Sequence, residues 1–155
     1  MRLKPLLRDV RRAIEQLTEG WRGGGASGPL LMRAELVAAE VLTNVVEHGF
    51  AGGHDGEIEV VSHASDKAVI LLVRDNGGPM PGGAAPCGLA PEIPETTEEL
   101  PEGGFGWYLI RSLTHRLDYC RRDGCNCLCV EIREEDGNDR PARRCAAGDV
   151  RAEPG

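Results

Sequence analysis

The sequence predicts an α+β protein, a two-layer sandwich in which helices cover one face of a mainly antiparallel sheet. Three observations predict it. Hydrophobic patterns of helices and strands follow one another in the order α-α-β-β-loop-α-β-β, and consecutive strand patterns are joined by short turns. The chain has 155 residues, enough for one domain with a core of its own. Only 4% of the residues are aromatic, so the core is expected to be aliphatic.

Two helices are expected before the first strand. Apolar residues recur at intervals of three or four across residues 5–19, and the glycine-rich stretch 20–25 is expected to end that helix. A second helix is expected over residues 29–47. Ser27 is its predicted N-cap, a proline follows closely, and Gly49 is its predicted stop.

A pair of strands and a third helix follow. Residues 57–63 alternate between polar and apolar, and residues 68–73 are continuously apolar, which predicts two antiparallel strands with the second central and buried on both faces. The next stretch, residues 75–104, is irregular and rich in glycine and proline. A loop of about 30 residues in a compact domain is usually functional. Residues 105–117 then have the pattern of a helix.

The last predicted elements are the strands 118–122 and 125–133, joined by Asp123-Gly124, a strong signal for a type I′ turn. This register places Cys120 opposite Cys127 and puts the thiols on the outer face, where a homodimer interface would be one use for them. Zinc binding is the less favoured alternative, because three alternating cysteines span about 13 Å. The role of this group stays open; its members are Cys120, Cys125, Cys127 and Cys129.

Composition excludes several classes of function. The formal charge of −7 and the pI of about 5.1 argue against direct binding to nucleic acid. The longest apolar run has six residues, too short for a membrane span, and no apolar segment follows the basic N-terminus as in a signal peptide. We expect a cytoplasmic protein with reduced cysteines, one domain over residues 1–135 and a flexible tail over residues 136–155.

The second helix carries a row of polar residues. Glu40, Asn44 and His48 are spaced four apart, so they lie along one side of the helix at the border of its apolar stripe. One interpretation is a polar helix edge whose groups are satisfied locally. The other is a carboxylate base and an amide metal ligand that face a cavity. A single asparagine together with nucleotide phosphates would suit Mg²⁺, which prefers oxygen ligands and keeps several waters.

Two further segments favour the second interpretation. Asp75 ends the apolar strand and is followed by Gly77, so a carboxylate could meet the exocyclic amine of adenine, although Asp-Asn-Gly-Gly is also a plain turn sequence. Gly104 and Gly106 open the third helix, and backbone N–H groups at a helix N-terminus bind anions. Taken alone, each of these signals is weak.

Together, in this order, the three segments resemble a known set of motifs. Residues 39–49 (Ala-Glu-Val-Leu-Thr-Asn-Val-Val-Glu-His-Gly) resemble the N box of the GHKL ATPases, and residues 75–77 and 104–113 resemble their two glycine boxes. The His-Gly that ends the N box and the Leu-Ile-Arg-Ser-Leu after the glycines are most similar to anti-sigma-factor serine/threonine kinases. The resemblance covers residues 5–134 and implies the Bergerat-type ATP-binding fold, with ATP and Mg²⁺ as ligands.

The resemblance implies a role for each residue of the helix row. Glu40 would be the general base that orients or deprotonates the attacking hydroxyl. Asn44 would be the Mg²⁺ ligand. His48 would make a supporting polar contact near the nucleotide.

It implies nucleotide contacts for the other two segments. Asp75 would recognise the adenine amine, and Gly77 would permit close approach. Gly104 and Gly106 would let the helix N-terminus and the preceding loop wrap the phosphates.

The implied activity is transfer of the γ-phosphoryl group to a serine or threonine of an anti-sigma antagonist of the STAS fold, with a sigma factor or similar regulator as the second partner. The alternative is a non-catalytic ATP-binding module that switches between partners. Residues 79–103, the predicted lid, contain five glutamates and no lysine or arginine, which favours the module. Arg111 could replace the missing cation, although a solvated helix residue is the simpler interpretation. A histidine-kinase catalytic half is disfavoured, because no phospho-acceptor helix pair is present.

Overall fold

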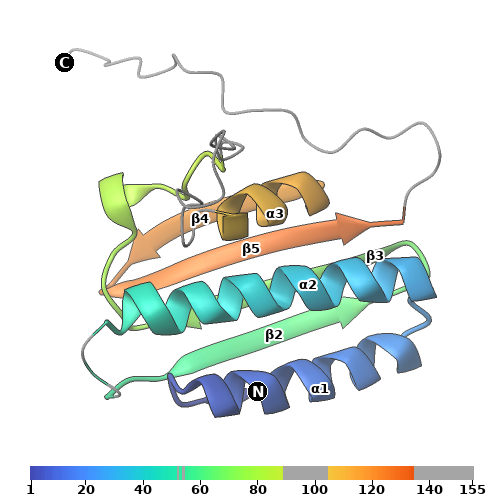
Figure 1. Cartoon of the computed structure of the whole chain (residues 1–155), viewed down its shortest axis with the longest axis horizontal. Coiled ribbons are helices and arrows are strands. Elements are labelled where there is room, and N and C mark those ends of the chain that lie inside the picture. Colours follow the sequence, from blue (N-terminus) through green and yellow to red (C-terminus); the bar gives the residue numbers. More distant parts are fainter. Residues whose placement is uncertain (52, 54, 89–104, 135–155) are drawn as a thin grey trace, which may run out of the picture.

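The computed structural model describes residues 1–51, 53, 55–88 and 105–134, which form a five-stranded antiparallel sheet with helices on one face (Figure 1). The strand order is β1-β2-β3-β5-β4. The strands are β1 (Arg2–Leu3), β2 (Ile58–Ala64), β3 (Ala68–Asp75), β4 (Arg116–Arg122) and β5 (Cys125–Arg133). The helices are α1 (Leu7–Gly23), α2 (Gly28–Asn44), the π-helical turn η1 (Val45–Gly49), the 3₁₀ turn η2 (Pro81–Gly83) and α3 (Phe105–Leu113). This architecture confirms the predicted α+β sandwich.

The core lies between the helices and the sheet. Figure 1 shows α1, α2 and α3 side by side in one layer, with the sheet behind them. Aliphatic side chains supply nearly all of the buried surface, as the composition predicted. The largest fully buried side chains are Trp21, Leu30, Leu42, Ile58, Leu71, Ile110 and Ile132. None of the helices in the described ranges is long and apolar enough to cross a membrane.

The first two helices differ from the prediction at their ends. Helix α1 continues through Gly20 because Trp21 is buried, and its indole Nε1 donates a hydrogen bond to Ser62 Oγ at 3.1 Å. Burying so large a side chain outweighs the low helix propensity of one glycine. Helix α2 begins as predicted, since Ser27 Oγ accepts a hydrogen bond from the Leu30 N–H at 3.2 Å. The α-helical part ends earlier than expected, at Asn44, and the chain continues as the π-helical turn η1 as far as Gly49.

The prediction for β3 was wrong in one respect. The strand is central, but only one of its faces is buried: Ile70 and Leu72 are each 41% exposed. Within the described residues the helices cover a single face, so every second side chain of the strand points outward. Helix α3 also ends earlier than expected, at Leu113. Thr114 Oγ1 donates a hydrogen bond to the Ile110 carbonyl at 2.8 Å, and β4 begins at Arg116.

The C-terminal hairpin forms as predicted. Asp123 and Gly124 have φ angles of 51° and 77°, as a type I′ turn requires, and Cys120 pairs with Cys127. The thiols lie on the open face, because the alternate β5 residues Leu128 and Val130 are buried. Among the described residues no group of three or more His, Cys, Asp or Glu side chains is arranged to hold a metal ion.

Candidate functional site

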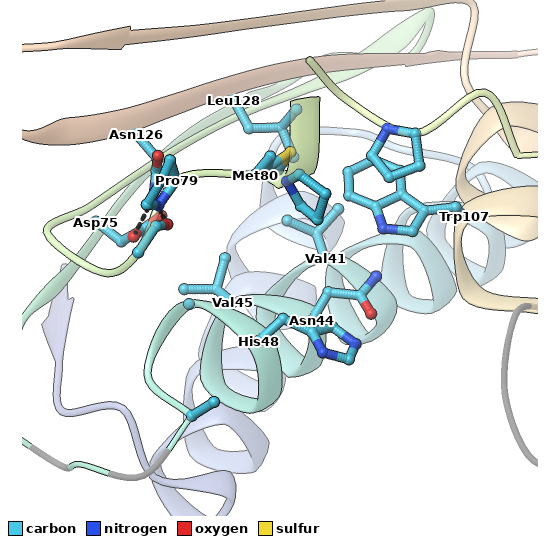
Figure 2. Close-up of a pocket in the computed structure, with 15 residues that line it drawn as sticks. Val41, Asn44, Val45, His48, Asp75, Pro79, Met80, Trp107, Asn126 and Leu128 are labelled. Carbon is cyan, nitrogen blue, oxygen red and sulfur yellow. Dashed lines mark hydrogen bonds between the residues drawn. The ribbon is translucent and has the colours of Figure 1, made fainter. Parts of the chain in front are cut away.

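A cavity of about 450 Å³ lies between the end of α2, the loop after β3, the start of α3 and the inner face of β5 (Figure 2). Its walls are mostly apolar, and its few polar groups come from different elements. Pockets of this size and character bind small molecules that combine an apolar body with a few polar contacts. Among the lining residues are Val41, Asn44, Val45, His48, Asp75, Met80, Trp107, Asn126 and Leu128.

Two residues of the predicted helix row reach this cavity. Asn44 is the last residue of α2, His48 lies in η1, and both line the cavity (Figure 2). Single π-turns within helices are rare and concentrate at functional sites. The change of helix type at Asn44 therefore falls at the cavity itself.

The Asn44 side chain carries an unsatisfied group. Its Nδ2 is buried and has no hydrogen-bond partner among the described residues. A buried donor without a partner costs about 1–3 kcal/mol. The cost is recovered if a ligand in the cavity supplies an acceptor, so this atom points to a polar or anionic ligand group at this end of the cavity.

Glu40, the third member of the row, lies beside Asn44 but does not line the cavity. It is partly covered by Gly106 in the first turn of α3: a Cβ atom at Gly106 would lie only 2.7 Å from Glu40 Oε2 and 3.5 Å from Asn44 Nδ2. A side chain at this position would displace the Glu40 carboxylate, so glycine lets the helix N-terminus lie against it, and the helix dipole there favours the carboxylate. The structure thus brings Glu40, Asn44 and Gly106 together.

Asp75 ends β3 at the opposite side of the cavity and is only 5% exposed. Its Oδ1 accepts hydrogen bonds from the Gly77 N–H at 2.9 Å and from Asn126 Nδ2 at 2.8 Å. Burial raises the pKa of this carboxyl above its ordinary value, whereas those two hydrogen bonds and the charge of Arg121 act to lower the pKa. Because both bonds arrive at Oδ1, Oδ2 remains for a donor on a ligand.

Gly77 permits a close approach, but the partner is the chain itself. A Cβ atom at this position would lie 2.6 Å from the Gly49 carbonyl oxygen, and the Gly78 N–H donates to that oxygen at 2.7 Å. The loop after β3 is therefore fixed to the end of η1. Gly77 does not itself line the cavity, whereas Gly78 does.

Several residues of the cavity were missed by sequence reasoning. Asn126 is 4% exposed and holds Asp75, while Met80, Trp107 and Leu128 supply apolar wall. The signal for Asn126 was present, because the alternation of β5 places it on the same inward face as Leu128. A polar residue on a core-facing strand position needs a partner. The wall residues carried no comparable signal.

Part of the predicted site cannot be placed. Gly104 and most of the predicted lid, residues 89–103, lie outside the described residues. Arg111 lies within the described residues and is not a freely solvated helix residue. Its Nε donates a hydrogen bond to the Pro86 carbonyl at 3.1 Å, and its Nη2 donates one to the Ala85 carbonyl at 3.2 Å. The guanidinium thus holds the described start of the lid against α3.

The domain is a two-layer α+β sandwich, and its interlayer cavity is lined by the buried Asp75 and by Asn44, whose Nδ2 has no partner among the described residues. The chain belongs to the histidine kinase-like ATPase domain family, which matches residues 3–132. The catalytic domain of the histidine kinase ThkA has the same fold, with a TM-score of 0.50 at 18% identity, over 86% of this chain and 94% of that one.

Named relatives are found at higher identity. The serine/threonine-protein kinase BtrW of Bordetella bronchiseptica is 34% identical over 102 residues, which are 66% of this chain and 70% of BtrW. The serine-protein kinase RsbW of Listeria innocua is 34% identical over 80 residues, about half of either chain.

Proposed function

We propose that this protein is an anti-sigma-factor-like serine/threonine protein kinase that binds Mg-ATP in the cavity. The observation that carries the proposal is that Asn44, whose buried Nδ2 has no partner among the described residues, and the buried Asp75 carboxylate line one cavity. The relatives named as serine or serine/threonine kinases support the reaction type. The apolar wall between the two polar groups suits a purine.

The residues at the α2 end fit a magnesium-bound triphosphate. Asn44 offers a carbonyl oxygen, a ligand that Mg²⁺ accepts, and its unpartnered Nδ2 would donate to a phosphate oxygen. The ion, when bound, supplies neutralisation of phosphate charge. Gly106 would let the N-terminus of α3 approach the phosphates, and His48 would add a polar contact at the cavity wall.

Glu40 would orient the attacking serine or threonine hydroxyl and accept its proton while the hydroxyl oxygen bonds to the γ-phosphorus and ADP leaves. Phosphoryl transfer depends on positioning and electrostatics more than on covalent catalysis, so one carboxylate next to the metal ligand is enough. Glu40 lies beside Asn44, as this role requires, and Gly106 must shift for a substrate to reach it.

We infer that the substrate is a STAS-type anti-sigma antagonist and that a sigma factor or similar regulator is the alternative partner of the chain in a partner switch. The relatives named serine-protein kinase RsbW support the kinase part of this inference. A homodimer is compatible with the open sheet face.

A pull-down from the source organism, with and without ATP, tests the proposal. We expect a partner that carries a new phosphoserine or phosphothreonine only with ATP, and radiolabel transfer from γ-labelled ATP to the purified partner. Glu40→Ala should lower the transfer by about 10²–10⁴-fold, and Glu19→Ala, which removes an exposed acid on α1, should leave it unchanged. A wild-type chain that binds its partner with ATP but transfers no phosphoryl group would overturn the kinase assignment, and a wild-type rate of transfer in Glu40→Ala would overturn the role of Glu40 as the base.

One observation favours the second candidate, a non-catalytic ATP-binding module. The described part of the lid, residues 79–88, contains no lysine or arginine, and Arg111 is occupied by the carbonyls of Ala85 and Pro86. The module predicts ATP-dependent capture of a partner without phosphorylation in the same pull-down.

A further inference from the structure

Three side chains of the β4–β5 hairpin converge on Asp75 and the loop that follows it. Asn126 projects from β5, and Tyr119 and Arg121 project from β4. Tyr119 Oη and Arg121 NH1 both donate to Asn126 Oδ1, at 2.8 Å and 2.6 Å. Figure 2 shows Asn126 directed at Asp75. None of these three residues has a role in the chemistry described above.

The hydrogen bonds of Asn126 fix which way its amide faces. Its Nδ2 donates to Asp75 Oδ1 and to the Gly78 carbonyl, both at 2.8 Å, and its Oδ1 accepts the two bonds from β4. A guanidinium only donates and a carbonyl only accepts, so Arg121 and Gly78 together allow a single orientation. That orientation presents a donor to Asp75, which favours its ionised form.

The same hairpin holds the loop directly. Arg121 NH1 donates to the Gly77 carbonyl at 3.0 Å, and the Met80 N–H donates to Tyr119 Oη at 3.3 Å. With the bond from the asparagine amide to Gly78, three backbone groups between residues 77 and 80 are held by hairpin side chains. Gly78 and Met80 line the cavity, so this loop forms one of its walls.

We propose that Tyr119, Arg121 and Asn126 act as positioning residues, a hairpin clamp that keeps Asp75 as a hydrogen-bond acceptor and so sets the preference of the site for adenine over guanine. The inference rests on the proposed ATP site. Adenine presents an amine at C6 and guanine a carbonyl, so a carboxylate acceptor favours the first. Without the clamp, Asn126 would no longer be held with its amide N–H toward Asp75, so the carboxyl would lose a hydrogen-bond donor and the loop beside it its anchor, and the discrimination between the two purines would fall.

The test compares calorimetric affinities for Mg-ATP and Mg-GTP in the full chain and its variants. Arg121→Met and Tyr119→Phe should each lower the ratio of ATP to GTP affinity by about tenfold, the usual worth of a hydrogen bond to a charged network. Arg121→Lys, which retains charge and donors, should recover most of the ratio. Arg122→Met is the matched control, because this neighbouring arginine is exposed on the opposite face of β4.

Hydrogen exchange in the nucleotide-free protein gives a second readout. The Met80 amide should exchange faster in Tyr119→Phe, and the amides of Gly77 and Gly78 should do so in Arg121→Met, while Arg122→Met leaves all three unchanged. Folded variants with the wild-type affinity ratio and wild-type exchange would overturn the clamp. A wild-type chain that binds neither nucleotide would overturn the proposed function and the selectivity, while the exchange rates would still decide whether the clamp holds the loop.

Discussion

Asp75 is the residue at which burial and hydrogen bonding oppose each other most clearly. Desolvation raises the pKa of its carboxyl above the ordinary value of 3.8, and bonds from Asn126 and Gly77 lower the pKa only in part. An ionised carboxylate buried this deeply costs stability. Functional residues are often kept in such unfavourable environments, because the strained group serves the ligand rather than the fold.

This balance predicts how stability depends on pH. The pKa of Asp75 is higher in the folded state than the value of 3.8 in the unfolded state. Between these two pKa values the folded state binds more protons than the unfolded state, so the free energy of unfolding falls as pH rises through this range. In Asp75→Asn this fall should be absent. Denaturant unfolding of both proteins from pH 3.5 to 7 measures it: the variant should gain stability relative to the wild type as pH rises. A difference that does not change with pH would contradict the assignment.

Single residues also show how far sequence reasoning reaches. Asn44, His48 and Asp75 were predicted from local patterns, and the structure brings all three to one cavity. Their roles remain predictions. Asn126 was missed although the alternation of β5 placed it on the inward face, because its partner Asp75 lies 51 positions away along the chain.

At the scale of elements, the contact between η1 and the loop after β3 closes one end of the cavity. It depends on Gly77, whose hydrogen atoms are the only substituents that fit against the Gly49 carbonyl. The neighbouring atoms are backbone, which cannot rotate away as a side chain would. A larger side chain at Gly77 would therefore disturb the fold as well as the site.

Gly77→Ala should consequently lower the free energy of unfolding by about 1–3 kcal/mol, the usual cost of overpacking, and should weaken Mg-ATP binding. Gly20→Ala is the control: it adds the same methyl group within α1, where no atom lies within 4 Å. There alanine should stabilise the protein by about 0.5–1 kcal/mol. Chemical denaturation and calorimetry check both variants, and equal effects at the two sites would disprove the packing argument.

Element types were predictable from periodicity, whereas element ends were decided by tertiary contacts. The burial of Trp21 carries α1 past Gly20, and the pairing of Leu117 with Val130 turns the expected end of the third helix into the start of β4. The open face of β3 was mispredicted because an apolar run does not say whether one or two layers cover it.

For the whole molecule, the family match and the described domain agree in extent. The match covers residues 3–132, and β5 ends at Arg133. Residues 136–155, the predicted tail, lie outside the described residues. Among the described residues, those that line the cavity all lie between Val41 and Leu128.

Truncation after Glu135 should therefore leave ATP affinity within about twofold of the full chain, since every residue assigned to the proposed site precedes the cut. Calorimetric titration of both proteins measures this. A loss of tenfold or more, with an unchanged melting temperature, would show that the tail contributes to the site.

The antiparallel sandwich itself was predictable because its determinants are local: amphipathic helices, alternating strands and a type I′ turn. The cavity was predictable only through the resemblance of three separated motifs. The arrangement of Glu40 under Gly106, outside the cavity lining, could not be foreseen, since it depends on how α3 packs against α2.

In the proposed site α2 separates chemistry from binding, with Glu40 as the base and Asn44 as the metal ligand. Calorimetric titration of Mg-ATP into Glu40→Ala and Asn44→Ala, each shown to be folded, tests it most directly. Glu40→Ala should keep the wild-type affinity while phosphoryl transfer falls by about 10²–10⁴-fold, whereas Asn44→Ala should lose Mg-dependent binding and transfer together. A Glu40→Ala protein that loses ATP affinity as severely as Asn44→Ala would contradict the account.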